Sequence, residues 1–152
     1  MACIFEIELG ASDVIALLAF LVAGLSALYA RWSWLEARRA NRISLLGHRM
    51  EIYNAFFDLK MHMAQMAEFA ELSEVSKFYY PSRSAKIYLP SGLANDIGKY
   101  FDACFSIADI RRKYGGISRE SSADCKPHKD TERDLVLKID KQFMALLKEA
   151  QS

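Results

Sequence analysis

The stretch VIALLAFLVAGLSALYA runs from Val14 to Ala30, and none of its seventeen residues carries a charged side chain. A helix of seventeen to nineteen residues rises about 26–29 Å, close to the thickness of a hydrocarbon core. Tyr29, Trp32 and Trp34 flank its far end, where membrane proteins concentrate aromatic residues. The stretch therefore predicts a transmembrane helix at residues 14–30. The flanking residues disfavour the alternative, a core helix of a soluble protein.

The charges on either side of the span predict its orientation. The tail at residues 1–13 holds acidic residues and no Lys or Arg, whereas Glu36 alone opposes the arginines between Arg31 and Met50. Positively charged flanks remain in the cytoplasm, so we expect a single-pass protein of the cell inner membrane with its N-terminus outside. A secretory signal peptide needs a positive segment before its apolar run. Cleavage is therefore disfavoured, although Ala27 and Ala30 are small enough to precede a cleavage site.

Composition indicates long helices and excludes several classes of protein. The chain has 152 residues, a net charge of +1, and only three prolines and seven glycines. Scarce turn-forming residues fit helices better than a β fold. The near-neutral charge gives no indication of a nucleic-acid partner. Cys3, Cys104 and Cys125 are an odd and scattered set, which argues against a disulfide framework.

Helical periodicity continues beyond the span and predicts one helix over residues 12–72, with Gly47 as the place for a bend. Two apolar rows appear on it: Ile43, Leu46, Met50, Tyr53 and Phe57, and then Leu45, Ile52, Phe56, Leu59 and Met63. Together they are too wide for a two-stranded coiled coil and require two partner helices. Arg49 and Lys60 fall between the rows, where an unpaired charge is costly. The expected partners are Asp96, Asp102 and Asp109.

The remaining sequence predicts two shorter helices. Residues 73–90 form a connector, with SRSAKIY (82–88) as a short helix before Pro90. A helix at 91–114 begins with Ser91 as N-cap and ends at Gly115-Gly116. A polar loop follows at 115–129, and Thr131 with Asp134 resembles the capping box of a helix at 131–150. The expected fold is all-α: a transmembrane helix continuous with a long cytosolic helix, packed by two shorter helices as a small antiparallel bundle. Residues 31–150 form its cytosolic domain.

Two sets of residues on the first helix are candidate functional residues. Ala19, Ala23 and Ala27 recur every four residues beside Gly24, and such small-residue faces let membrane helices self-associate. The second set faces the membrane surface, where anionic headgroups attract basic residues: Arg31, Trp32, Trp34, Arg38, Arg39 and Arg42. The alternative, which we favour, is that the first arginines only set topology and that the later ones pair within the bundle.

Patterns for metal binding or catalysis are incomplete. Asp58 and His62 are spaced i,i+4, with Glu51 two turns earlier, but no HExxH or second His pair accompanies them. Cys125 and His128 resemble half of a zinc site, and Cys104 with His48 or His62 does not complete it at a known spacing. Glycine-rich nucleotide loops and GxSxG are absent. We therefore predict no catalytic, cofactor-binding or metal-binding residue, because a solvated helix face and a free thiol explain these residues better.

The layout of the chain resembles a loose class of uncharacterised small bacterial membrane proteins. An acidic-tailed span precedes an arginine-rich helix, RISLLGHRMEIYNAFFDLK (42–60), and then YLPSGLANDIGKYFD (88–102). The resemblance implies one N-terminal anchor and a helical cytosolic region, with many members in prophages and mobile elements. It implies no activity and no site residues.

These observations favour a membrane-tethered helical interaction module that is not catalytic, needs no cofactor and self-associates through its span. Its partners are the lipid bilayer, a second copy of the chain and an unknown protein, but not nucleic acid. The alternative is a membrane-active effector, of the exclusion or toxin type, that perturbs the bilayer on oligomerising. An enzyme using Asp58, His62 and a cysteine is a third hypothesis.

Overall fold

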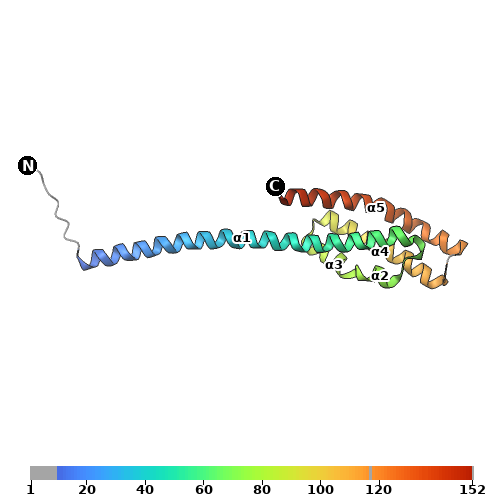
Figure 1. The fold of residues 1–152 in the computed structure, drawn as a ribbon, viewed down its shortest axis with the longest axis horizontal. Coiled ribbons are helices and arrows are strands. Elements are labelled where there is room, and N and C mark those ends of the chain that lie inside the picture. Colours follow the sequence, from blue (N-terminus) through green and yellow to red (C-terminus); the bar gives the residue numbers. More distant parts are fainter. Residues whose placement is uncertain (1–9, 117, 152) are drawn as a thin grey trace, which may run out of the picture. The chain divides into compact units, whose positions relative to one another are not determined.

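The computed structural model describes residues 10–116 and 118–151. Within these ranges the chain forms helices and connecting turns without any strand, which confirms the all-α prediction. The expected acidic tail lies mostly outside the described residues, as does Cys3. Figure 1 shows the order of the helices along the chain.

The first helix, α1 (Ala11–Met66), is the longest element. Its helical assignment continues through Gly47 and ends earlier than the predicted Leu72. Ala67 follows with φ of +47°, a left-handed conformation common where helices end, and a 3-10 turn occupies Ala67–Phe69. No glycine marks this point in the sequence, which explains why the pattern did not predict it. The chain divides within α1, between Ile43 and Ser44, into two compact units, residues 1–43 and 44–152.

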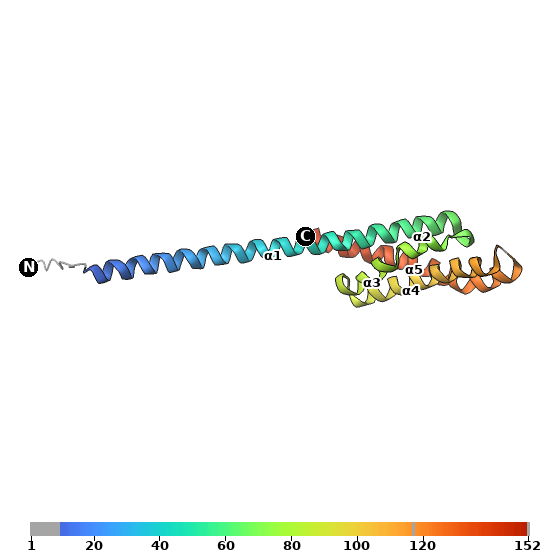
Figure 2. The ribbon, with the colours of Figure 1, turned by 90° about the horizontal axis from the view of Figure 1, so that it is seen from below.

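The second unit is built around helix α4 (Ser91–Tyr114). The other helices are α2 (Leu72–Lys77), α3 (Tyr79–Tyr88) and α5 (Arg119–Gln151). α5, α3 and α2 all pack against α4, and Figure 2 shows α3 beside α4. Ten residues of α4 are buried, more than on any other helix that the structure describes in this unit, because neighbours cover several of its sides.

Residues 44–66 of α1 complete the core through aromatic contacts. The Phe56 ring lies 5.2 Å from that of Tyr100 on α4 and 6.1 Å from that of Phe143 on α5. Of the two predicted apolar rows, the second is buried at Ile52, Phe56, Leu59 and Met63, as expected. The first row was wrongly expected to be buried as well, since Met50 and Phe57 remain exposed.

The largest error concerns residues 115–129, which were expected to be a loop. α5 begins at Arg119 and contains Pro127. Ser118 and Ser121 cap its start reciprocally: the backbone N–H of each donates to the hydroxyl of the other, at 2.8 and 3.0 Å. The capping box expected at Thr131 is also wrong, because the Thr131 hydroxyl donates to the Pro127 carbonyl inside the helix.

The connector at 73–90 is more helical than predicted. The expected short helix at 82–88 is present but starts at Tyr79, and α2 precedes it. Pro81 is tolerated because it lies in the first turn of α3, where backbone N–H groups have no helical acceptor. The bounds of α4 match the predicted 91–114, and Gly115 ends it with φ of +66°. Its N-cap is Pro90, however, and not Ser91.

The carboxylates predicted to pair with Arg49 and Lys60 were Asp96, Asp102 and Asp109, and this prediction is wrong. The Lys60 ammonium pairs with Asp140 on α5 at 2.8 Å, and Arg49 Nε donates to the backbone carbonyl of Tyr88 at 3.0 Å. Asp96 pairs instead with Lys138 at 2.8 Å. No local pattern specifies these pairs, because they depend on how α1, α4 and α5 approach one another.

Candidate functional site

The first unit is an apolar helix with exposed side chains. An 18-residue window of α1 has a mean hydropathy of 2.1 and no buried residue. Phe20 is 74% exposed and Leu25 66% exposed. This helix is long and apolar enough to cross a membrane, by length and composition. A core helix of a soluble protein and a signal sequence pass the same test.

The predicted assembly residues Ala19, Ala23 and Ala27 all lie on this part of α1 and are exposed. Residues four apart share one face of a helix, so their small side chains form a shallow row. A Cβ atom added at neighbouring Gly24 meets nothing within 4 Å. The row is therefore open to a partner helix, and it involves no other element of the fold.

The predicted surface residues follow directly on the same helix, and Arg31, Trp32, Trp34, Arg38, Arg39 and Arg42 are all exposed. The Arg38 guanidinium lies 5.4 Å from the centre of the Trp34 ring, within range of a cation–π contact. Arg39 meets Glu36 at 3.4 Å, an exposed pair of little energetic weight. These contacts join neighbours one turn apart, so the arrangement is an aromatic and basic helix surface, not an enclosed site.

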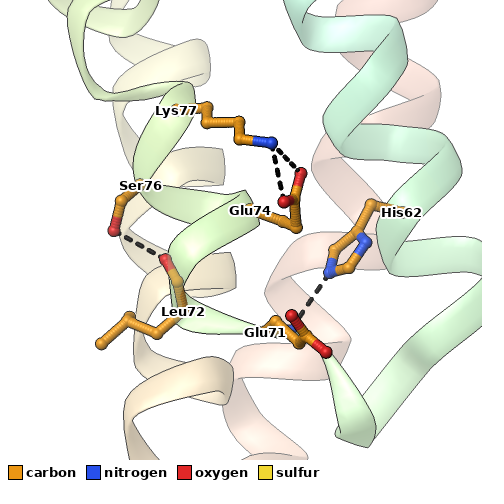
Figure 3. A network of polar contacts seen from close by, with 6 residues as sticks. All are labelled: His62, Glu71, Leu72, Glu74, Ser76 and Lys77. Carbon is orange, nitrogen blue, oxygen red and sulfur yellow. Dashed lines mark hydrogen bonds and ion pairs between the residues drawn. The ribbon is translucent and has the colours of Figure 1, made fainter.

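The candidate metal ligands Asp58 and His62 line one pocket, and His62 and Glu51 are each engaged in other contacts. Figure 3 shows His62 Nε2 accepting a hydrogen bond from the backbone N–H of Glu71, at 3.1 Å. In the same network Lys77 binds both carboxylate oxygens of Glu74 at 2.6 and 2.7 Å, which lowers the pKa of Glu74. Glu51 contacts His48 at 3.3 Å instead of turning toward Asp58. His62 thus tethers α1 to the turn that precedes α2.

The two described cysteines are buried on different helices. Cys104 on α4 is fully buried and Cys125 on α5 is 3% exposed, and desolvation raises the pKa of both thiols. A raised pKa leaves little thiolate at neutral pH, so these thiols are poor nucleophiles and poor metal ligands. Within the described residues no group of three or more His, Cys, Asp or Glu side chains is placed to hold a metal ion.

Sequence reasoning missed a polar cluster at the contact of α4 and α5. The Tyr100 hydroxyl is buried and makes no hydrogen bond to the described residues. Desolvation raises the pKa of Tyr100 and also that of the partly buried Glu132 on α5. The helical period placed Tyr100 on the apolar face, but the approach of Glu132 depends on the packing of α5. Tyr100 is fully buried in the core, whereas Glu132 is partly exposed.

No protein family, curated protein or solved structure was found to match this chain.

Proposed function

We propose that this protein is a membrane-tethered, non-catalytic interaction module that spans the inner membrane once through α1 and self-associates there. The observation that carries the proposal is the apolar window of α1, none of which is buried. Nine large apolar side chains between Val14 and Leu28 are at least 45% exposed. At about 1.5–3 kcal/mol for each fully buried side chain, covering them stabilises the protein by on the order of 10 kcal/mol.

A bilayer accounts for this surface better than the two alternatives. A core helix of a soluble protein needs the window covered, and exposed apolar surfaces of this size are rare on soluble monomers. A signal sequence carries its positive charges before the apolar run, whereas here the arginines follow it. The same arginines, with Trp32 and Trp34, support an N-terminus outside and a cytoplasmic C-terminal unit.

The C-terminal unit supports the interaction role because it has a complete core and still exposes apolar side chains. Phe56, Tyr100 and Phe143 are fully buried, whereas Tyr80 is 79% exposed and Ile87 76% exposed. Exposed aromatic and aliphatic side chains of this kind are common where proteins bind one another. The buried thiols and the lack of an enclosed polar site in the described residues give no support to catalysis.

Alkaline carbonate extraction of membranes tests the anchor. The unmodified chain is expected to stay in the membrane pellet. Leu21→Arg with Leu25→Arg should release it, because each central charge costs about 2.5–3.5 kcal/mol in a transmembrane helix. Leu35→Arg, beyond the first arginine, is the matched control and should stay in the pellet. Release of the unmodified chain by carbonate would overturn the anchor.

Thiol labelling of intact cells tests the orientation. A membrane-impermeant maleimide is expected to label Cys3 from outside, and Cys3→Ser should remove the signal, because the other two cysteines are buried. Labelling only after the membrane is permeabilised would reverse the orientation.

Self-association is tested by energy transfer between labelled full-length chains in vesicles. Ala23→Leu should reduce transfer, because it fills the shallow row formed by the three alanines. Val22→Leu, about 100° away around the helix, is the control that should not reduce it. Equal effects of the two changes would refute the alanine interface. Following membrane potential during expression tests the effector alternative, since depolarisation abolished by Ala23→Leu would favour an effector over a passive module.

A further inference from the structure

A small cleft between α3 and α4 gathers basic side chains from both helices. Its volume is about 130 Å³, and Arg83 and Lys86 line it from α3 while Asn95, Gly98 and Lys99 line it from α4. Figure 2 shows the two helices side by side in the C-terminal unit. Asp102 lies at the same cleft and is its acidic residue. Three cations thus share a small volume with one carboxylate.

These cations have no carboxylate partner in the part of the chain that the structure describes. Arg83, Lys86 and Lys99 form no ion pair within 4 Å there, although Asp102 lines the same cleft. Five other cations of this unit do pair with a carboxylate among the described residues: Lys60, Lys77, Arg112, Lys129 and Lys138. Three like charges that share a cleft with a single carboxylate repel one another, and a bound anion reduces that repulsion.

The cleft also has features that suit an oxyanion. The Arg83 guanidinium lies 5.3 Å from the centre of the Tyr79 ring, a stacking contact that restricts its orientation. Gly98 contributes no side chain, so the surface of α4 is open there, and a Cβ atom added to it meets nothing within 4 Å. Asn95 is exposed and its amide offers two further N–H donors.

We propose that this cleft binds one phosphate group. A guanidinium fork, two ammonium groups and an amide are donors that match the several oxygens and the negative charge of phosphate. The volume is below the roughly 300–1,000 Å³ typical of pockets for whole drug-sized ligands, so only the phosphate group itself is enclosed. The group belongs either to a phospholipid headgroup or to a soluble phosphate compound. This site stands apart from the proposed function, because both helices belong to the second unit and the argument does not use the span.

The test is a titration of the isotope-labelled full-length chain, in which the amide NMR signals of Gly98 and Lys99 report binding. In one arm the chain is in neutral detergent and inorganic phosphate is added against sodium chloride of equal ionic strength. In the other arm it is in neutral bicelles and phosphatidic acid is added. Saturable shifts in the first arm indicate a soluble ligand, and saturable shifts in the second arm alone indicate a headgroup. Shifts that chloride reproduces, or none in either arm, would overturn the proposal.

Four variants separate this site from general attraction to basic residues. Lys99→Gln should weaken binding about tenfold, the effect of losing one charge-assisted hydrogen bond. Gly98→Ala should also weaken it, by filling the cleft without disturbing the fold. Asp102→Asn should tighten it, because the opposing charge is removed. Lys141→Gln, an exposed lysine on α5, is the matched control, and a loss there equal to that of Lys99→Gln would refute the site.

Discussion

Two adjacent phenylalanines, Phe56 and Phe57, provide the sharpest test of how α1 packs in the C-terminal unit. Phe56 is fully buried between Tyr100 and Phe143, whereas Phe57 is 42% exposed and contacts Tyr53 at a ring distance of 6.4 Å. Truncation of a buried phenylalanine costs about 3–5 kcal/mol, because it removes apolar burial and leaves a cavity. Phe56→Ala should fall at the upper end of that range, since both ring contacts are lost with it.

Phe57→Ala should lower the free energy of unfolding by only about 1 kcal/mol. Full burial of a phenylalanine side chain contributes about 1.5–3 kcal/mol, and Phe57 is only roughly half buried. The expected difference of 2 kcal/mol or more is large against the roughly 5–15 kcal/mol stability of a domain. The native thiols provide the assay. In a Cys3→Ser background in detergent, Cys104 and Cys125 become reactive only on unfolding, so pulse labelling against urea gives the unfolded fraction. Equal costs for the two substitutions would refute the assignment of the buried row.

Three further predictions concern α1, the turn after it and its contacts with α5. Ala67→Gly should raise the free energy of unfolding by about 1 kcal/mol in the same urea assay, because a left-handed residue with a Cβ is strained. A lower stability would contradict the strain. A double-mutant cycle of Lys60→Met and Asp140→Asn should give a coupling energy of about 1–2 kcal/mol. This value lies between those of exposed and buried ion pairs, because both side chains are partly exposed. Additive effects of the two substitutions would contradict the pairing. The hydrogen bond and charge of Lys129 lower the pKa of Glu68. The Glu68 carboxylate therefore contributes its full stabilisation above its unfolded-state pKa of about 4.3. This stabilisation is lost as the pH falls through the lower pKa of the folded state. Glu68→Gln should reduce stability at neutral pH and converge with the unmodified chain in acid; a constant difference would argue against this linkage.

The wrong prediction of a loop where α5 begins shows that tertiary packing can outweigh local sequence signals. Glycine, serine and Pro127 predicted a loop, and an internal proline costs a helix about 3 kcal/mol. Contacts made at a distance in sequence offset that cost: Cys125 is buried in the core, and Ser122 and Lys129 bind Glu68 at 3.2 and 2.7 Å. None of these partners is visible from the 115–129 segment alone.

Several elements of the fold could be predicted because neighbouring residues alone specify them. The apolar run from Val14 to Ala30, the helical period beyond it and the stop at Gly115 depend only on neighbouring residues, and they gave the all-α class and the bounds of α4 correctly. The candidate residues on the first part of α1 could also be identified from this local pattern. The contacts that the structure describes for them are with neighbours on the same helix.

Packing between helices selects which apolar row of α1 is buried and which carboxylate pairs with Lys60, and it brings Arg83, Lys86 and Lys99 to one cleft. Periodicity gives each helix a face but not the neighbour that covers it. That choice depends on the fit of side chains such as Phe56, Tyr100 and Phe143, which lie far apart in the chain. Their contact is the result of packing among whole helices, and no single segment encodes it.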